Sequence, residues 1–239
     1  MKLGFLLGYS GKHIHIPIDL IKQAESMGYD SVWTAEAYGN DAVTSAAYVL
    51  AQTSKIRVGT AIMQMPARTP AMCAMTAMSL DQLSGGRFIV GLGASGPQVV
   101  EGWHGVPYGK PVTRTKEYIQ IMRKIFEREG PVEFDGQMYQ MPNQSEGTTG
   151  LGKPLKSILA AASDIPIYTA SITPAGLRCA GEVADGVFPV WMDPNKYEVL
   201  GESIEQGFEK AGNGKSLKDF DVAPFVTVAM NDDLDAAYD

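Results

Sequence analysis

Short apolar runs alternate along the chain with longer segments that carry one apolar face. A run that is apolar on both faces is typical of a parallel strand covered by helices on each side. Alternation of such strands with helices predicts a parallel sheet with right-handed connections. The predicted strands are Leu3–Leu7, Ser31–Trp33, Ile56–Ile62, Arg87–Leu92, Pro166–Ala170, Gly186–Val190 and Val222–Met230.

The helix that begins near Thr113 has the clearest period, because its apolar residues recur at every third or fourth position. These residues are Tyr118, Ile121, Met122, Ile125 and Phe126. The pattern fails between residues 130 and 155, where glycines and prolines indicate a long excursion with a hairpin around Asp135-Gly136. Further helices are predicted over 17–27, up to about 52, and over 71–83, 174–184 and 194–211.

Seven alternating strands account for all but one strand of a (β/α)8 barrel. We therefore predict that residues 1–239 form a single α/β domain, a TIM-type barrel that lacks its last strand and helices. An open doubly wound sheet is the alternative. An exposed strand edge promotes aggregation, so we expect a partner subunit, the 130–155 excursion or C-terminal residues to cover the gap.

A glycine loop, Gly91-x-Gly93-x-x-Gly96, follows the fourth predicted strand and lets a ligand approach the backbone. In a dinucleotide-binding fold the same spacing requires a helix to begin at once. Here Pro97 opens a stretch that we expect to be irregular, and the unit is the fourth in the chain rather than the first. These features argue against a nicotinamide site.

Composition excludes several classes of partner. The 239 residues carry a net charge of −7 and a pI near 5.0, which argues against a nucleic-acid partner. The sequence has no apolar run of membrane-spanning length and no signal peptide, so we expect no membrane partner and a cytoplasmic location. We expect both cysteines to be buried and unpaired, and the histidine spacing indicates no metal site.

In a barrel, chemistry takes place in the loops at the carboxyl ends of the strands. The loops expected there are rich in aromatic residues and poor in charge, which suits a flat aromatic ligand better than a metal or a sugar phosphate. Glu36 is a clear candidate, because burial explains a carboxylate at a strand end poorly. The candidate rim residues are Tyr9, His13, His15, Glu36, Tyr38, Arg68, Ser95, Trp103, His104 and Trp191.

Several motifs follow the order of one known family across the whole chain. They are Ala24–Trp33, Thr34-Ala-Glu-Ala-Tyr38, Lys55–Gly59, Arg68-Thr-Pro70, Leu80–Arg87, Gly91-Leu-Gly93, Gly105–Pro111, Asp164–Tyr168 and Ala184-Asp-Gly186. These motifs resemble the luciferase-like flavin and deazaflavin oxidoreductases, in particular the branch that uses coenzyme F420. The resemblance implies the same TIM-type barrel with further residues at its C-terminus.

The resemblance also implies how a cofactor would lie. Relatives have a non-prolyl cis peptide on the third strand that bulges against the tricyclic ring, and here it falls at Ala61–Ile62, facing the glycine loop. Relatives bind the coenzyme's phosphate with backbone N–H groups after strand five. The implied cofactor-binding residues are Glu36, Ala61, Ile62, Gly93, Ala94, Ser95, Ser171, Ile172 and Thr173.

The chain departs from the family pattern at three positions. Relatives place an acid–histidine pair after strand two, and here Glu36 is followed by Ala37. Gly96 stands where sugar-phosphate-oxidising relatives have a glutamate, so glucose 6-phosphate oxidation is not expected. Thr173 replaces the usual glycine of the phosphate turn.

The resemblance implies an oxidoreductase, a homodimer, that transfers a hydride between C5 of F420 and an unidentified small organic substrate. The candidate catalytic residues are Glu36, His104 and Tyr38, with Tyr9 as a further alternative for the proton donor. Two alternatives are an FMN-dependent luciferase-like monooxygenase and a non-catalytic protein that binds a flavin or deazaflavin.

Overall fold

The computed structural model describes residues 2–9, 11–190, 192–233 and 235. The parallel strands are β1 (Gly4–Leu6), β2 (Ser31–Thr34), β3 (Arg57–Thr60), β4 (Met63–Gln64), β5 (Phe88–Gly93), β8 (Ile167–Ala170), β9 (Gly186–Phe188) and β10 (Asp221–Val222). The helices are α1 (Ile18–Ser26), α2 (Ala42–Gln52), α3 (Pro70–Ser84), α4 (Pro97–Gly102), α5 (Pro111–Glu127), α6 (Pro174–Val183) and α7 (Glu198–Ala211), with short 3-10 turns η1 (Met65–Ala67) and η2 (Pro194–Lys196).

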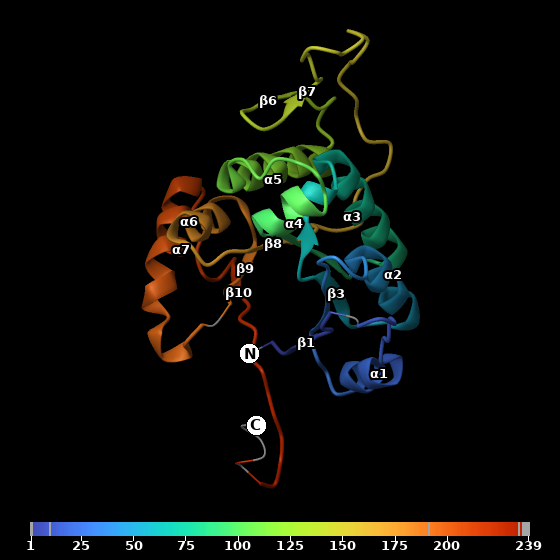
Figure 1. Ribbon diagram of the computed structural model, residues 1–239, viewed down its shortest axis with the longest axis vertical. Coiled ribbons are helices and arrows are strands. Elements are labelled where there is room, and N and C mark those ends of the chain that lie inside the picture. The colour runs from blue at the N-terminus through green and yellow to red at the C-terminus, as the bar shows by residue number, and fades with distance from the viewer. Residues whose placement is uncertain (1, 10, 191, 234, 236–239) are drawn as a thin grey trace.

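The parallel strands form a curved sheet in the order β1-β2-β3-β5-β8-β9-β10, with the longer helices on its outer side and the short α4 at one end (Figure 1). β4 follows β3 in the chain and pairs with β5. Strands that are consecutive in the chain are thus neighbours in space, which is the order of a barrel, whereas a doubly wound sheet reverses direction at a switch point. The predicted barrel is confirmed, and the doubly wound alternative is wrong.

Aromatic side chains fill the inner side of the sheet. The Trp33 ring lies 5.0 Å from the Phe188 ring and 5.6 Å from the Tyr168 ring, measured between centroids. The larger core lies between the sheet and the helices, where Tyr118 and Ile121 of α5 are fully buried, as their period predicts. None of the described helices is long and apolar enough to cross a membrane.

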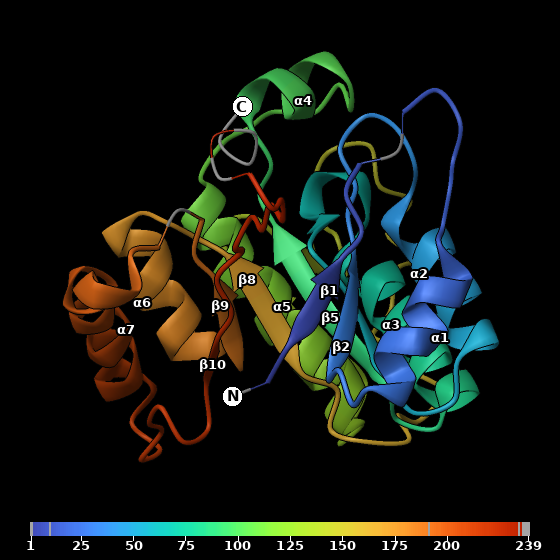
Figure 2. The same cartoon turned by 90° about the horizontal axis from the view of Figure 1, so that it is seen from below.

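The sheet is open between its first and last strands, β1 and β10 (Figure 2). Lys2 Nζ lies 2.9 Å from Asp221 Oδ2 and bridges the two edges, beside a cavity of about 860 Å³. The prediction that the last strand reaches Met230 is wrong, because Pro224 has no N–H to give to the ladder. Residues 223–226 line the cavity instead.

The 130–155 excursion lies beyond α5, away from this opening (Figure 1). It contains the predicted hairpin, in which β6 (Phe134–Asp135) pairs with β7 (Gln140–Met141). The Glu117 carboxylate of α5 accepts hydrogen bonds from the backbone N–H groups of residues 137–139 at 2.8 to 3.1 Å. This anchor holds the hairpin on the far side of α5, so the excursion does not cover the gap.

A short helix, α4, begins at Pro97, directly after the glycine loop. The prediction of an irregular stretch there is wrong, because proline at the first helical position needs no N–H partner and favours a helix start. Because a helix does follow the glycine loop, this feature no longer argues against a dinucleotide site. The barrel order of the strands supplies the argument instead, since a Rossmann sheet has a different strand order.

The segment from Ser84 to Arg87 builds the end of the sheet opposite the strand carboxyl ends. Gly85 ends α3 with a φ of 68°, a left-handed conformation that glycine adopts at little cost. Arg87 then donates to the carbonyls of Leu50 at 3.0 Å and Ile56 at 2.9 Å. These bonds join the end of α2 to the start of β3, so the segment from Ser84 to Arg87 has a structural role.

Candidate functional site

Glu36, in the loop after β2, accepts four hydrogen bonds although its side chain is only 7% exposed. Oε1 accepts from Arg68 Nη1 at 2.6 Å and from the Gln64 amide at 2.8 Å. Oε2 accepts from Arg68 Nη2 at 2.8 Å and from the Ala42 amide at 3.1 Å. Four donors directed at two oxygens suit an ionised acceptor. The geometry therefore argues against Glu36 as a proton donor.

Arg68, which follows β4 and the turn η1, is shared between two carboxylates. Besides Glu36 it pairs with Asp41, which caps α2 by accepting from the Thr44 amide at 2.6 Å. Burial alone would raise the pKa of Asp41, but the hydrogen bonds from Thr44 and the charge of Arg68 hold it below its usual value. Because Arg68 is paired within the protein, it is not a free cation for the acidic tail of a cofactor.

Gln64 brings a third loop to this cluster. It lies at the end of β4 with 1% of its surface exposed, and its Nε2 donates to the Ala37 carbonyl. Its Oε1 lies 3.1 Å from Nε2 of His104, which follows α4. The loops after β2, β4 and β5 thus meet at Gln64. The sequence did not mark this residue, because the third strand is predicted to end at Ile62; a polar side chain between two methionines was the available signal.

The peptide bond between Ala61 and Ile62 is cis, at the point where β3 gives way to β4. Ile62 packs on Gly93, where a Cβ would lie only 2.6 Å from Ile62 Cδ1. Thr60 Oγ1 donates to the Gly91 carbonyl and accepts from the Gly91 amide, both at 2.9 Å. The bulge and the glycine loop therefore form one continuous surface that leaves no room for larger side chains in the loop.

A model of the luciferase-like monooxygenase family matches residues 4–239. The chain belongs to this family. A putative coenzyme F420-dependent oxidoreductase of Mycobacterium tuberculosis is 45% identical over all of this chain and 69% of its own length. A 5,10-methylenetetrahydromethanopterin reductase of Methanolobus tindarius is 34% identical over 89% of this chain and 60% of its own length.

A solved structure shares the fold of this luciferase-like chain. The coenzyme F420-dependent tetrahydromethanopterin reductase from Methanopyrus kandleri matches with a TM-score of 0.82 at 27% identity. The match covers 99% of this chain and 68% of the reductase. The chain thus corresponds to roughly two thirds of each of these relatives.

The luciferase-like barrel has its phosphate-binding candidates next to the glycine loop. β8 pairs with β5, so the turn Ser171–Thr173 lies beside the residues that follow Gly93. Thr173 caps α6 by accepting from the Gly176 amide at 3.2 Å. Two hydroxyl groups at a helix N-terminus form a donor set that suits a phosphate. Ser95, on the neighbouring loop, has a φ of 61°, which is uncommon for a residue with a side chain.

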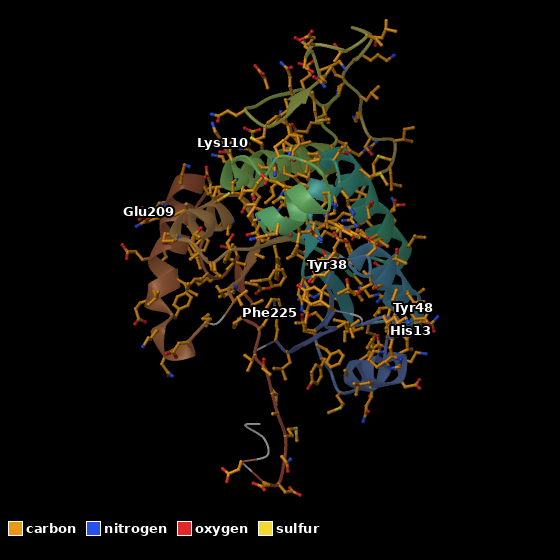
Figure 3. The ribbon with its side chains drawn as sticks, in the orientation of Figure 1. His13, Tyr38, Tyr48, Lys110, Glu209 and Phe225 are labelled. Atoms are coloured by element: carbon orange, nitrogen blue, oxygen red, sulfur yellow. The ribbon has the colours of Figure 1, made fainter. Side chains whose placement is uncertain are left out.

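The rim of this barrel carries large, exposed aromatic side chains. Tyr38 is 70% exposed, Tyr9 69% and Trp103 67%, and they come from the loops after β2, β1 and β5 (Figure 3 labels Tyr38). His13 is also exposed. Trp191, the remaining aromatic candidate for the rim, lies outside the described residues. The rim therefore offers apolar and hydrogen-bonding surface with little charge.

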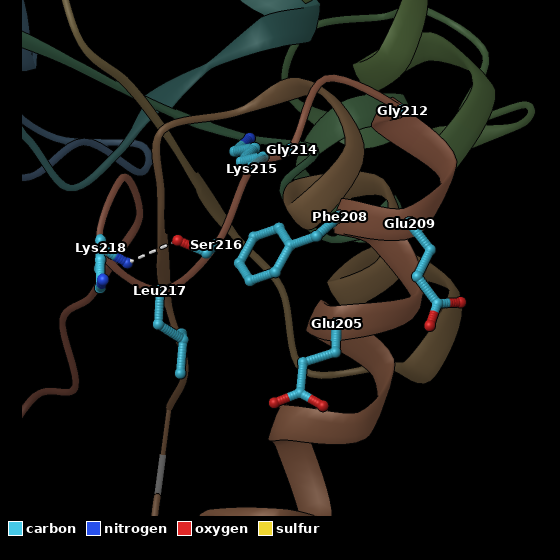
Figure 4. Close-up of a pocket in the computed structure, with 9 residues that line it drawn as sticks. All are labelled: Glu205, Phe208, Glu209, Gly212, Gly214, Lys215, Ser216, Leu217 and Lys218. Carbon is cyan, nitrogen blue, oxygen red and sulfur yellow. Dashed lines mark hydrogen bonds between the residues drawn. The ribbon is translucent and has the colours of Figure 1, made fainter.

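A second cavity, of about 700 Å³, lies between α7 and the segment before β10 (Figure 4). Lys215 donates from Nζ to the carbonyls of Gly181 at 2.9 Å and of Ala184, where α6 ends. The same Nζ lies 5.2 Å from the centroid of the Phe220 ring. This cavity is at the amino end of β10, and its partly buried amine is used to hold α6. It is therefore not the site of the family's chemistry.

Proposed function

We propose that the chain acts as a coenzyme F420-dependent oxidoreductase that transfers a hydride between the deazaflavin and a small organic substrate. The observation that carries the proposal is the packing of Ile62 on Gly93, which gives a firm apolar surface suited to backing a flat ring. The 45% identity to a protein named as F420-dependent favours a deazaflavin over FMN. When bound, the coenzyme supplies the hydride chemistry, and the protein supplies orientation and a proton carrier.

The residues that would hold the coenzyme come from neighbouring loops at one end of the sheet. The bulge at Ala61–Ile62 would back the ring, with the loop Gly93–Ser95 beside it. The turn Ser171–Thr173 would bind the phosphate through its hydroxyls and the N-terminus of α6. Glu36 would act indirectly, because its carboxylate holds Arg68 and the Gln64 backbone in place.

Reduction or oxidation of an organic carbonyl or imine also requires a proton to be moved. His104 and Tyr38 are the candidates to move it, since both lie on loops at the carboxyl ends of the strands. His104 is partly buried and held by Gln64, whereas Tyr38 is 70% exposed and free to approach a substrate. Glu36 is better suited to positioning, because both of its oxygens already accept hydrogen bonds.

The test is turnover by the chain with F420 in the absence of oxygen. A panel of alcohols, enones and imines is offered with oxidised or reduced coenzyme, and the deazaflavin absorbance is followed. We expect turnover with at least one class, and a decrease of about 100-fold in kcat for His104→Asn. Binding without turnover across the panel would favour the non-catalytic alternative. Oxygen-dependent turnover with FMN would favour a monooxygenase. Either result would overturn the proposal.

A homodimer and a cytoplasmic location are part of the same proposal. Exposed apolar side chains on α2 and α3 support a subunit contact there, with Tyr48 51%, Met72 53% and Met75 53% exposed. Light scattering after size exclusion measures the mass in solution. A monomer at the highest soluble concentration would count against the dimer.

A further inference from the structure

Every polar group of the Gln64 side chain has a partner. Its Nε2 donates to the Ala37 carbonyl, and its Oε1 lies 3.1 Å from His104 Nε2. Its backbone amide donates to Glu36 at 2.8 Å. Because only 1% of the residue's surface is exposed, solvent water cannot replace these hydrogen bonds. A buried amide in this position holds its partners in one geometry.

The Ala37 carbonyl determines which way the Gln64 amide points. A carbonyl oxygen only accepts hydrogen bonds, so it must face the NH2 end of the amide. The reversed amide would place two oxygens against each other and an NH2 group against the imidazole. Oε1 is therefore the atom that faces His104, and the ring nitrogen opposite an oxygen acceptor must carry a proton.

We infer that Gln64 is a positioning residue that holds neutral His104 as its Nε2–H tautomer and leaves Nδ1 as the atom that exchanges the catalytic proton. Among the described residues, Nδ1 has no hydrogen-bond partner. When Nδ1 takes a proton, the ring becomes an imidazolium, and Nε2–H keeps its bond to Oε1. The proton then leaves from Nδ1 without rotation of the ring. This inference rests on the proposed function for the role of His104 as proton carrier.

Gln64 also connects His104 to the ion pair. The Glu36 carboxylate binds both the Gln64 backbone and Arg68, and Gln64 in turn binds the ring of His104. In register, Gln64 pairs with Gly93, the residue on which Ile62 packs. The residue that orients the imidazole is thus fixed to the surface proposed to back the ring. A Gln that merely satisfied its own backbone would not be aimed at a titratable side chain.

The tautomer is measured by long-range proton–nitrogen NMR on protein labelled in its histidine rings, without cofactor or substrate. The chain has three histidines, and His104→Asn assigns the signal of interest. At a pH where the rings are neutral, we expect His104 to be wholly Nε2–H, with exposed His13 and His15 in exchange between tautomers. His104 carrying its proton on Nδ1 in the wild type would overturn the inference.

Two variants separate the acceptor from simple packing. Gln64→Leu removes the acceptor, so His104 should exchange between tautomers as His13 does, and kcat with F420 should fall about tenfold or more. Gln64→Glu loses the donor to the Ala37 carbonyl but keeps an oxygen acceptor opposite the ring, so it should keep the Nε2–H form. Gln82→Leu is the matched control. The Gln82 amide donates to the Ala160 carbonyl at 2.6 Å, outside the site, so this variant should leave the His104 tautomer unchanged. An unchanged tautomer in Gln64→Leu would contradict the positioning role.

Turnover distinguishes this inference from the proposed function. If the chain does not turn over F420 with any substrate, the proposed function fails, while the tautomer of His104 is still measured. If turnover occurs but His104→Asn leaves kcat unchanged, the claim that Nδ1 exchanges the proton is overturned. If His104→Asn and Gln64→Leu both lower kcat and Gln64→Glu lowers it less than Gln64→Leu does, the inference is supported.

Discussion

Arg68 donates to Glu36 from both terminal nitrogens: Nη1 lies 2.6 Å from Oε1, and Nη2 lies 2.8 Å from Oε2. The pair ties the segment after β4 to the loop after β2. It is largely buried, with side-chain exposures of 17% for Arg68 and 7% for Glu36. Removing Glu36 leaves Arg68 with Asp41 as its remaining carboxylate partner, whereas removing Arg68 leaves the buried Glu36 carboxylate without a cation. The pair therefore affects both the arrangement of the site and the stability of the fold.

Replacing Glu36 by Gln is expected to lower the free energy of unfolding by about 1–3 kcal/mol, because Arg68 and two backbone amides lose a charged acceptor while Arg68 keeps its pair with Asp41. F420 binding should weaken as well, since the Gln64 backbone loses its acceptor. Urea denaturation and cofactor titration measure the two effects. Asp193→Asn is the control, because the exposed Asp193–Lys196 pair spans 4.0 Å and should contribute at most about 1 kcal/mol. Unchanged stability, F420 affinity and turnover in the Glu36→Gln variant would remove Glu36 from the site.

Gly93→Ala tests the surface proposed to back the ring. The added Cβ would lie 2.6 Å from Ile62 Cδ1, so Ile62 must move out of its position. We expect F420 affinity to fall about tenfold or more while the chain stays folded, with the loss partly restored by adding Ile62→Ala. Gly102→Ala is the control, since a Cβ there meets no other atom within 4 Å. Equal F420 affinity in the Gly93→Ala variant and the wild type would count against the bulge as the ring's support.

Lys215→Met tests the structural role assigned to the second cavity. Burial lowers the pKa of the Lys215 amine, yet its Nζ still holds two carbonyls at the end of α6. Loss of these bonds should destabilise the fold by about 1–3 kcal/mol without changing F420 affinity. Lys218→Met, at an exposed position in the same cavity, should have little effect. If the two variants are equally stable, Lys215 does not hold α6.

Asp221 should make stability depend on pH in the acid range. Burial alone would raise the pKa of Asp221, but the Tyr168 hydroxyl and the Lys2 charge hold it below its ordinary value of 3.8. A carboxylate with a lowered pKa stabilises the folded state above its ordinary pKa, and the contribution is lost as the pH falls through the folded-state value.

Asp221→Asn should therefore lower the thermal midpoint at pH 7, with the difference from wild type shrinking as the pH approaches 3. Scanning calorimetry across this range measures the difference. Asp232→Asn, at an exposed position, is the control and should change the midpoint little at any pH. A wild-type advantage that stays constant down to pH 3 would contradict the assignment.

The sequence predicts the strands well because most of them are buried on both faces, as Phe88–Gly93 is along its whole length. It predicts α5 because one face of that helix enters the core. It overextends the last strand, since the run 222–230 is apolar but Pro224 interrupts the ladder. Both outcomes have local causes. An apolar run favours a buried strand, and a proline within the run ends the strand because it has no N–H to donate.

The site is less predictable, because its contacts join residues far apart in the chain. The position of Glu36 at a strand end follows from barrel topology, but its pairing with Arg68 does not follow from any local pattern. The same holds for the bond between Gln64 and His104. The Ala61–Ile62 bulge came from the family resemblance, since nothing in a regular apolar strand marks it.

The most direct test of the central claim is a titration of the purified chain with F420 and, separately, with FMN, followed by the fluorescence of each cofactor. We expect saturable binding of F420 with one cofactor per chain, weaker binding of FMN, and a loss of F420 affinity in Gly93→Ala but not in Gly102→Ala. Tight binding of FMN with no measurable binding of F420 would contradict the central claim.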